Sequence, residues 1–149
     1  MLACVVSRGP NRSTLVPAAV TTAQVHSIVS LTSDEEISKK SPSYASAIAN
    51  GSVPCHRWSL SVPDRGAPDN ESEFLNLASE VSESLKSGKN VMVHCGAGIG
   101  RTGMFAALVL MRLRVPLEEA LRRVKAAGSS PETSEQSAFL ERMRPNTDG

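Results

Sequence analysis

Residues 91–103, "VMVHCGAGIGRTG", constrain the fold of this chain more than any other stretch. A short apolar run ends in a histidine and a cysteine, a glycine-rich turn follows, and an apolar segment continues to residue 114. The first run predicts a buried strand, and the later segment, apolar nearly all round, predicts a buried helix. A strand that feeds a helix through a tight turn is typical of a parallel sheet covered by helices.

The rest of the chain repeats this alternation of strands and helices. Short runs rich in β-branched residues predict strands at 2–6, 25–31, 56–62 and 90–94. We therefore predict an α/β fold with a central, mostly parallel sheet of four to five strands and helices on both faces. No repeat or linker divides the chain, so we expect a single domain over residues 1–149, with about 145–149 as a flexible tail.

Capping residues predict where three helices begin or end. Asn70 and Glu73 have the spacing of a capping box, and Gly88 suits the position after the end of that helix. A second helix is expected from Pro116 to about residue 127, and a last one near residue 133, where Thr133 and Gln136 fit another capping box.

Composition identifies no partner class. Sixteen Lys and Arg residues nearly cancel fifteen Asp and Glu residues, which disfavours a nucleic-acid partner without excluding one. Cys4, Cys55 and Cys95 are odd in number and far apart, unlike a disulfide framework, so we expect a reducing, cytoplasmic compartment. The N-terminal "MLACVVSRGP" has too few apolar residues for a signal peptide or a membrane span.

The glycine-rich turn has the chemistry of an anion cradle. Its three glycines let successive backbone N–H groups point into one concavity, to which the following helix adds its positive N-terminal end. Arg101 can add a bidentate fork, and positive potential around Cys95 favours a nucleophilic thiolate. The alternative is an inert cysteine beside a turn chosen for packing. A nucleotide-binding loop is disfavoured, because the spacing lacks the Gly-Lys-Ser/Thr end of a Walker loop and the third glycine of a dinucleotide fingerprint.

"HCGAGIGRTG", residues 94–103, resembles the Cys-x5-Arg loop of the protein tyrosine phosphatase superfamily. From "VHSIVSLTSDEEI" to the last helix, the chain is similar to small dual-specificity phosphatases. The resemblance implies a dual-specificity-phosphatase-like fold and a phosphatase that forms a phosphocysteine at Cys95. It also implies a phosphate-binding set of Gly96, Ala97, Gly98, Ile99, Gly100 and Arg101.

The leaving oxygen needs a proton, which the resemblance assigns to an upstream aspartate loop written Trp-Pro-Asp-x-Gly-x-Pro. "VPDRGAP" at 62–68 matches at every position but the first, so Asp64 is the expected general acid. Asp69 is the rival, although it suits a solvated position before a helix cap. Low-molecular-weight phosphatases and related arsenate reductases carry the cysteine ahead of the acid. Here the acid precedes Cys95 by thirty-one residues, which favours the dual-specificity branch.

The resemblance implies three supporting residues. Thr102 would donate to the sulfur, His94 would fix the loop by hydrogen bonding, and Gln136 would position the attacking water. Two of them have a simpler interpretation, Thr102 as a first-turn helix residue and His94 as a core residue. Glu132 could assist, but a surface glutamate in a first turn is the simpler interpretation.

We expect no cofactor and no metal. His26, His56, Cys4 and Cys55 show no metal-ligand spacing, and the expected chemistry needs no metal ion. Cys55 is expected on the strand that leads to the acid loop and could form a disulfide with Cys95 on oxidation, although a buried small residue is its simpler interpretation.

The substrate class stays open at this point. A phosphorylated protein is the expected partner, with phosphate-like oxyanions such as vanadate as inhibitors and no membrane contact. The phosphotyrosine-recognition pattern of large tyrosine phosphatases is absent from the sequence, which favours a permissive cleft. The alternatives are a phosphoinositide phosphatase, disfavoured by the lack of lysine in the loop, an RNA 5′-phosphatase, and a non-catalytic phosphate-binding pseudophosphatase. The intact Cys95, Arg101 and Asp64 argue against the last.

Overall fold

The computed structural model describes residues 2–4, 24–96 and 99–145. Their sheet has four parallel strands in the order β1, β4, β2, β3. The strands are β1 (Leu2–Cys4), β2 (Ser27–Ser30), β3 (His56–Ser59) and β4 (Val91–His94). Each lies inside a range predicted from the sequence, and the predicted α/β fold with a parallel sheet is confirmed. The proposed tail, beyond residue 145, lies outside the described residues.

The central strands β2 and β4 are buried along their whole length, whereas β3 at the sheet edge is half exposed. Ser30 pairs with His94 at the last rung, and Leu31 N donates to His94 O at 3.0 Å just beyond it. Both strands therefore end at one edge of the sheet. In open parallel sheets, ligands bind outside this carboxyl edge.

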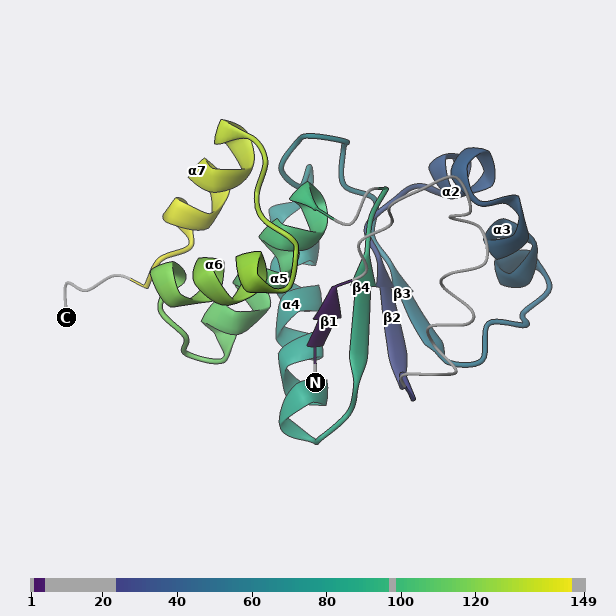
Figure 1. The fold of residues 1–149 in the computed structure, drawn as a ribbon, viewed down its shortest axis with the longest axis horizontal. Coiled ribbons are helices and arrows are strands. Elements are labelled where there is room, and N and C mark those ends of the chain that lie inside the picture. The colour runs from purple at the N-terminus through teal and green to yellow at the C-terminus, as the bar shows by residue number, and fades with distance from the viewer. Residues whose placement is uncertain (1, 5–23, 97–98, 146–149) are drawn as a thin grey trace.

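Four helices lie on one side of the sheet, two of them against the strands and two packed on the outside of this pair (Figure 1). They are α4 (Glu71–Lys86), α5 (Gly100–Arg112), α6 (Leu117–Ala126) and α7 (Ser134–Arg142). The predicted caps are confirmed: Asn70 Oδ1 accepts from Glu73 N at 3.1 Å, and Thr133 Oγ1 accepts from Gln136 N at 3.2 Å. Gly88, after α4, has a φ of +85°, the left-handed conformation expected of it.

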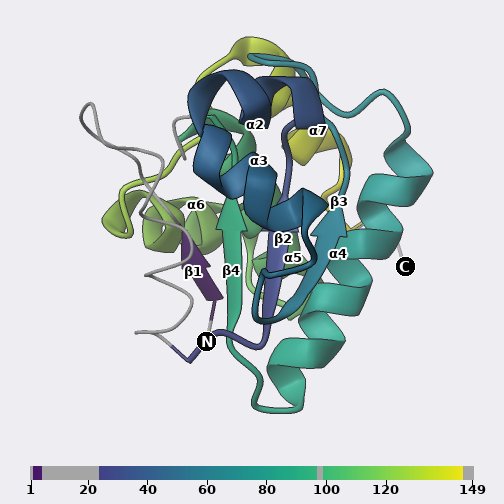
Figure 2. The same ribbon diagram turned by 90° about the vertical axis from the view of Figure 1, so that its right-hand side faces the viewer.

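The other face carries α2 (Asp34–Lys40) and α3 (Pro42–Ala49), which the sequence analysis did not predict. Figure 2 shows both helices in front of the sheet. Ser33 caps α2 through a 3.2 Å bond from Glu36 N to its Oγ, and Pro42 occupies the first turn of α3. The expectation of helices on both faces is therefore confirmed. In addition, α2 contributes two charged residues, Glu36 and Lys40, to the site described below.

The main core lies between the sheet and the four-helix layer. Residues 104–109 of α5 are all buried, as predicted for a helix in the middle of the domain. Alternate strand residues separate the two faces: Val29, Val91 and Val93 join this core, whereas Ile28 and Met92 form a smaller cluster on the other side. No helix among the residues described is long and apolar enough to cross a membrane.

Candidate active site

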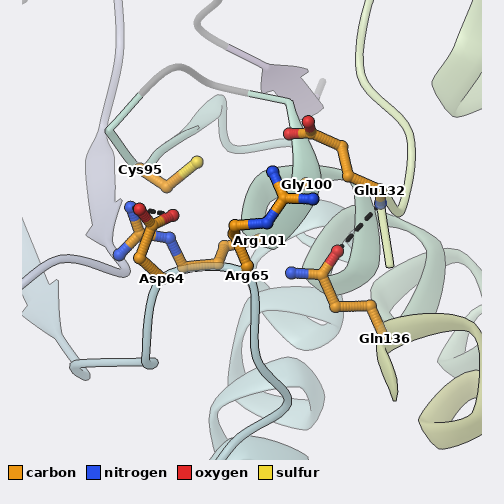
Figure 3. A pocket seen from close by; sticks show the side chains of 7 residues that line it. All are labelled: Asp64, Arg65, Cys95, Gly100, Arg101, Glu132 and Gln136. Carbon is orange, nitrogen blue, oxygen red and sulfur yellow. Dashed lines mark hydrogen bonds and ion pairs between the residues drawn. The ribbon is translucent and has the colours of Figure 1, made fainter. Parts of the chain in front are cut away.

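A pocket with about 240 Å³ of empty space lies at the carboxyl edge of the sheet (Figure 3). Three segments contribute to it: the Pro-Asp loop (residues 62–68), the described residues of the glycine loop (residues 95–101), and the turn before α7 together with the first turn of α7. Its lining residues are Asp64, Arg65, Cys95, Gly100, Arg101, Glu132 and Gln136. Residues that the sequence singled out from three distant segments thus meet in one place.

Cys95 lies one residue beyond β4 and is partly buried. The Thr102 hydroxyl, fully buried in the first turn of α5, donates to Cys95 Sγ over 3.1 Å. A hydroxyl that donates to sulfur stabilises negative charge there, and the N-terminal end of α5 acts in the same sense. The arrangement suits a sulfur that attacks or leaves as an anion.

Arg101 is 3% exposed and its guanidinium is held along one edge. Nη1 donates to Glu36 Oε2 at 2.9 Å and Nη2 to Glu36 Oε1 at 2.8 Å, while Nη1 also donates to the Val62 carbonyl at 3.1 Å. The hydrogen bond from Arg101 is the largest cause that lowers the pKa of Glu36 to about 2. Glu36 is therefore a carboxylate at neutral pH that orients Arg101. Among the described residues, Arg101 Nε has no hydrogen-bond partner, so it can donate to an oxyanion.

Gly96 lies close to the charged ends of three side chains. A Cβ at this position would lie 2.6 Å from Lys40 Nζ, 2.7 Å from Glu36 Oε1 and 2.9 Å from Arg101 Nη2. Lys40 Nζ donates to Glu36 Oε1 at 3.0 Å, and this ion pair of α2 lies next to Gly96 at the start of the glycine loop. A side chain at position 96 would have to displace the ends of these three charged side chains.

Asp64 lies beside the arginine, with its Oδ1 3.5 Å from Arg101 Nη2 and its side chain 71% exposed. Asp69 immediately precedes Asn70, the N-cap of α4, and is not among the described residues that line the pocket. The structure therefore brings Asp64, and not its rival, to the site.

Gln136 is 1% exposed and joins two of the pocket segments. Its Nε2 donates to the Gly66 carbonyl at 3.2 Å, and its Oε1 accepts from Glu132 N at 2.9 Å. Each end of the amide thus has one backbone partner and keeps one further proton or lone pair. The Glu132 carboxylate lines the pocket from the same turn.

Two more hydrogen bonds tie the Pro-Asp loop to the start of α7. Thr133 Oγ1 donates to the Arg65 carbonyl at 3.0 Å, and Ala67 N donates to Glu135 Oε1 at 3.3 Å. Together with the Gln136 bond, they hold the Pro-Asp loop in place over the pocket.

His94 is 5% exposed and lies under the glycine loop. Its Nε2 is hydrogen-bonded to Ser30 Oγ at 2.7 Å and to Tyr44 OH at 3.0 Å. Burial is the main cause that lowers the pKa of His94 to about 4, against a hydrogen bond with the Cys95 backbone that raises it. The ring is therefore neutral at pH 7 and connects β2, α3 and the start of the loop.

The suggestion that Cys55 pairs with Cys95 is wrong. Cys55 precedes β3 and packs near Ile28 and Met92, at the amino edge of the sheet, whereas Cys95 follows the carboxyl end of β4. At about 3.3 Å per residue, five residue levels separate the two by about 16 Å along the strands. A disulfide needs Cα atoms within about 7 Å.

Two predicted phosphate-binding residues, Ala97 and Gly98, lie outside the described residues. Ile99 precedes α5 as its N-cap residue, and Gly100 begins the helix. Among the described ranges, no group of three or more His, Cys, Asp or Glu side chains is arranged to hold a metal ion.

Sequence reasoning missed Glu36, Lys40 and Arg65 as site residues. Ser33 and Glu36 have capping-box spacing, a local signal for α2, but nothing in the sequence indicates that α2 faces the glycine loop. Arg65 occupies a variable position of the Pro-Asp-x-Gly-x-Pro pattern, which assigns it no role.

Comparison with known proteins agrees with this geometry. Residues 3–147 match the family model described as "Swiss Army Knife protein, DSP-PTPase phosphatase domain". Tyrosine phosphatase H3 of Microplitis demolitor bracovirus (isolate Webb) is 37% identical over 99 residues, covering 56% of this chain and 31% of that relative. The chain thus matches about a third of the length of that curated relative.

Two solved structures share the fold. Tk-PTP in its active form superposes with a TM-score of 0.72 at 22% identity, covering 95% of this chain and 88% of that one. A mouse dual specificity phosphatase complexed with zinc tungstate has a TM-score of 0.64 at 19% identity, covering 85% of this chain and 73% of that one.

The family match spans nearly the whole chain, and the cysteine, arginine and aspartate of its motif meet in one pocket. The resemblance first seen in ten residues therefore extends to the complete fold. The chain belongs to the dual-specificity phosphatase domains of the protein tyrosine phosphatase superfamily, in the group described as Swiss Army Knife proteins.

Proposed function

We propose that this chain hydrolyses phosphotyrosine, and also phosphoserine and phosphothreonine, in proteins through a phosphocysteine intermediate. The observation that carries the proposal is the common pocket of Cys95, Arg101 and Asp64, in which Thr102 donates to the sulfur. A nucleophile, an oriented cation and an acid are the parts that this reaction requires.

In the first step, Cys95 Sγ attacks phosphorus and the bond to the leaving oxygen breaks. Asp64 donates its proton to that oxygen, while Arg101 and the amides of the glycine loop stabilise the equatorial oxygens. The bidentate hydrogen bonds between Arg101 and Glu36 support this role, because a guanidinium held at its Nη1 and Nη2 atoms presents its Nε–H group in a fixed direction.

In the second step, water attacks phosphorus and the phosphorus–sulfur bond breaks. Asp64 takes the proton of the water, and the sulfur leaves as a thiolate that accepts the Thr102 hydrogen bond. Gln136 keeps one donor and one acceptor site free to hold that water.

The same pocket should bind phosphate-like oxyanions. The mouse neighbour was solved with zinc tungstate, which supports an oxyanion site in this fold. We expect vanadate to inhibit competitively and to occupy the glycine loop beside Arg101.

The proposal is tested by assaying peptides carrying phosphotyrosine, phosphoserine or phosphothreonine beside a phosphoinositide and a 5′-triphosphate RNA, in reducing buffer. Turnover of the phosphopeptides that is lost in Cys95→Ser supports the proposal. Cys95→Ser with near-wild-type turnover would remove Cys95 as nucleophile, and exclusive turnover of the phosphoinositide or the RNA would reassign the substrate.

The role of Asp64 is tested through pH and leaving group. Asp64→Asn should flatten the alkaline limb of the rate profile and lower the rate by about 10²- to 10⁴-fold, the usual contribution of general acid catalysis. The loss should shrink for substrates whose leaving group is already a good anion. Asp69→Asn is the matched control, and an effect confined to it would reassign the acid.

A further inference from the structure

Arg65 presents an unpaired guanidinium to the pocket. Its side chain is exposed and lines the pocket with Asp64 and Glu132. Among the described residues, no ion pair or hydrogen bond engages its guanidinium. Only its carbonyl has a partner, the Thr133 hydroxyl at 3.0 Å.

The neighbouring cations differ from Arg65 in this respect. Arg101 is bidentate to Glu36 and lies near Asp64, and Lys40 is paired with Glu36 as well. Arg65 therefore adds positive charge at the rim, and no carboxylate of the residues described lies within ion-pair distance of it. A substrate anion can therefore accept hydrogen bonds from the Arg65 guanidinium without breaking an existing ion pair.

The backbone at Arg65 adopts a conformation that is strained for an arginine. Its φ is +63°, in the left-handed region that glycine or asparagine occupies with less strain. The hydrogen bond from Thr133 holds this conformation, and residues in such conformations concentrate at functional sites. Because the Arg65 guanidinium has no partner among the described residues, the contacts of this side chain do not compensate for the backbone strain.

We propose that Arg65 is a specificity-determining residue that binds a second anionic group on the substrate, next to the phosphate being transferred. The preferred substrate is a phosphopeptide with a carboxylate or a second phosphate close to the phosphorylated residue. This inference rests on the phosphatase function proposed above and names the substrate class for that site.

The test compares Arg65→Gln and Arg65→Lys with Arg114→Gln. Arg114 is a matched control, since it is also an exposed arginine with a positive φ, of +68°, but follows the far end of α5. The 13 residues of α5 place it about 20 Å from the pocket. Glutamine keeps the Cβ at both sites, so the backbone strain is retained.

The substrates are one phosphotyrosine peptide with flanking Glu, Ala or Lys residues, a doubly phosphorylated version of it, p-nitrophenyl phosphate and a short-chain phosphoinositide. The wild type should prefer the Glu and doubly phosphorylated peptides over the Ala peptide by about tenfold, mainly through KM and less at high salt. Arg65→Gln should abolish this preference, Arg65→Lys should retain part of it, and Arg114→Gln should keep it. Whether Glu or the second phosphate is preferred distinguishes the two sources of the anion.

Three outcomes overturn the inference. One is hydrolysis of all peptides by the wild type without an acidic preference. Another is an equal loss for p-nitrophenyl phosphate and the acidic peptides in Arg65→Gln, which would assign Arg65 to the transferred phosphate. The third is a larger loss on a short-chain phosphoinositide than on the acidic peptides. A wild type that hydrolyses none of these compounds would instead contradict the proposed function itself.

Discussion

His94 should make the domain less stable in mild acid. In the unfolded chain a histidine takes up a proton near its usual pKa of 6.5, whereas burial lowers the pKa of the folded His94 to about 4. Between these values the unfolded state binds more protons, so the free energy of unfolding falls as pH falls through this window and then levels off. At about 1.4 kcal/mol for each tenfold change in proton affinity, the full loss is about 3 kcal/mol.

Urea unfolding followed by the fluorescence of Trp58, the single tryptophan, measures this loss at constant salt between pH 7 and 4.5. This range stays above the window of Glu36, whose contribution is lost only between 4.5 and about 2. His94→Gln should be less stable at pH 7 but should lose most of the pH dependence. His26→Gln, an exposed histidine, should keep it. An unchanged slope in His94→Gln would refute the assignment to this buried ring.

Three further outcomes are expected. Glu36→Gln should destabilise the domain by about 2 kcal/mol and lower turnover by releasing Arg101. It should also reduce the stability loss between pH 4.5 and about 2, and urea unfolding and steady-state kinetics measure these effects. Gly103→Ala should cost about 2 kcal/mol or more, seen as a lower Tm, because a Cβ there would lie 2.5 Å from the Ser130 backbone. Cys55→Ser should leave recovery from peroxide inactivation unchanged in a thiol-rescue assay, and a slower recovery would contradict the strand geometry.

The elements that the sequence predicted well are those set by neighbours in the chain. The strand at 91–94 and the helix after it follow from β-branched and apolar runs. The side chains of Asn70 and Thr133 each accept a hydrogen bond from the backbone N–H three residues later. Such contacts depend on residues that are adjacent whatever the rest of the fold does. Cys95, Arg101 and Thr102 belong to this class, because one turn and one helix start bring them together.

The position of the short helix α2 and the partner of its Glu36 do not follow from the local sequence. Its seven residues have capping signals, but helices of this length depend on tertiary packing for their stability. The spacing of Ser33 and Glu36 would also suggest a carboxylate directed at its own cap, whereas the structure directs it to Arg101, sixty-five residues away.

The sequence by itself determined the strand–loop–helix unit, its cysteine and arginine, and the aspartate motif upstream. Only the tertiary structure decided that Asp64 and not Asp69 reaches the arginine, that Cys55 lies at the far edge of the sheet, and that Glu36 pairs with the guanidinium. The physical reason is that these distances depend on strand order, register and helix packing. Those features arise from the burial of the whole core, and the spacing of residues along the chain does not encode them.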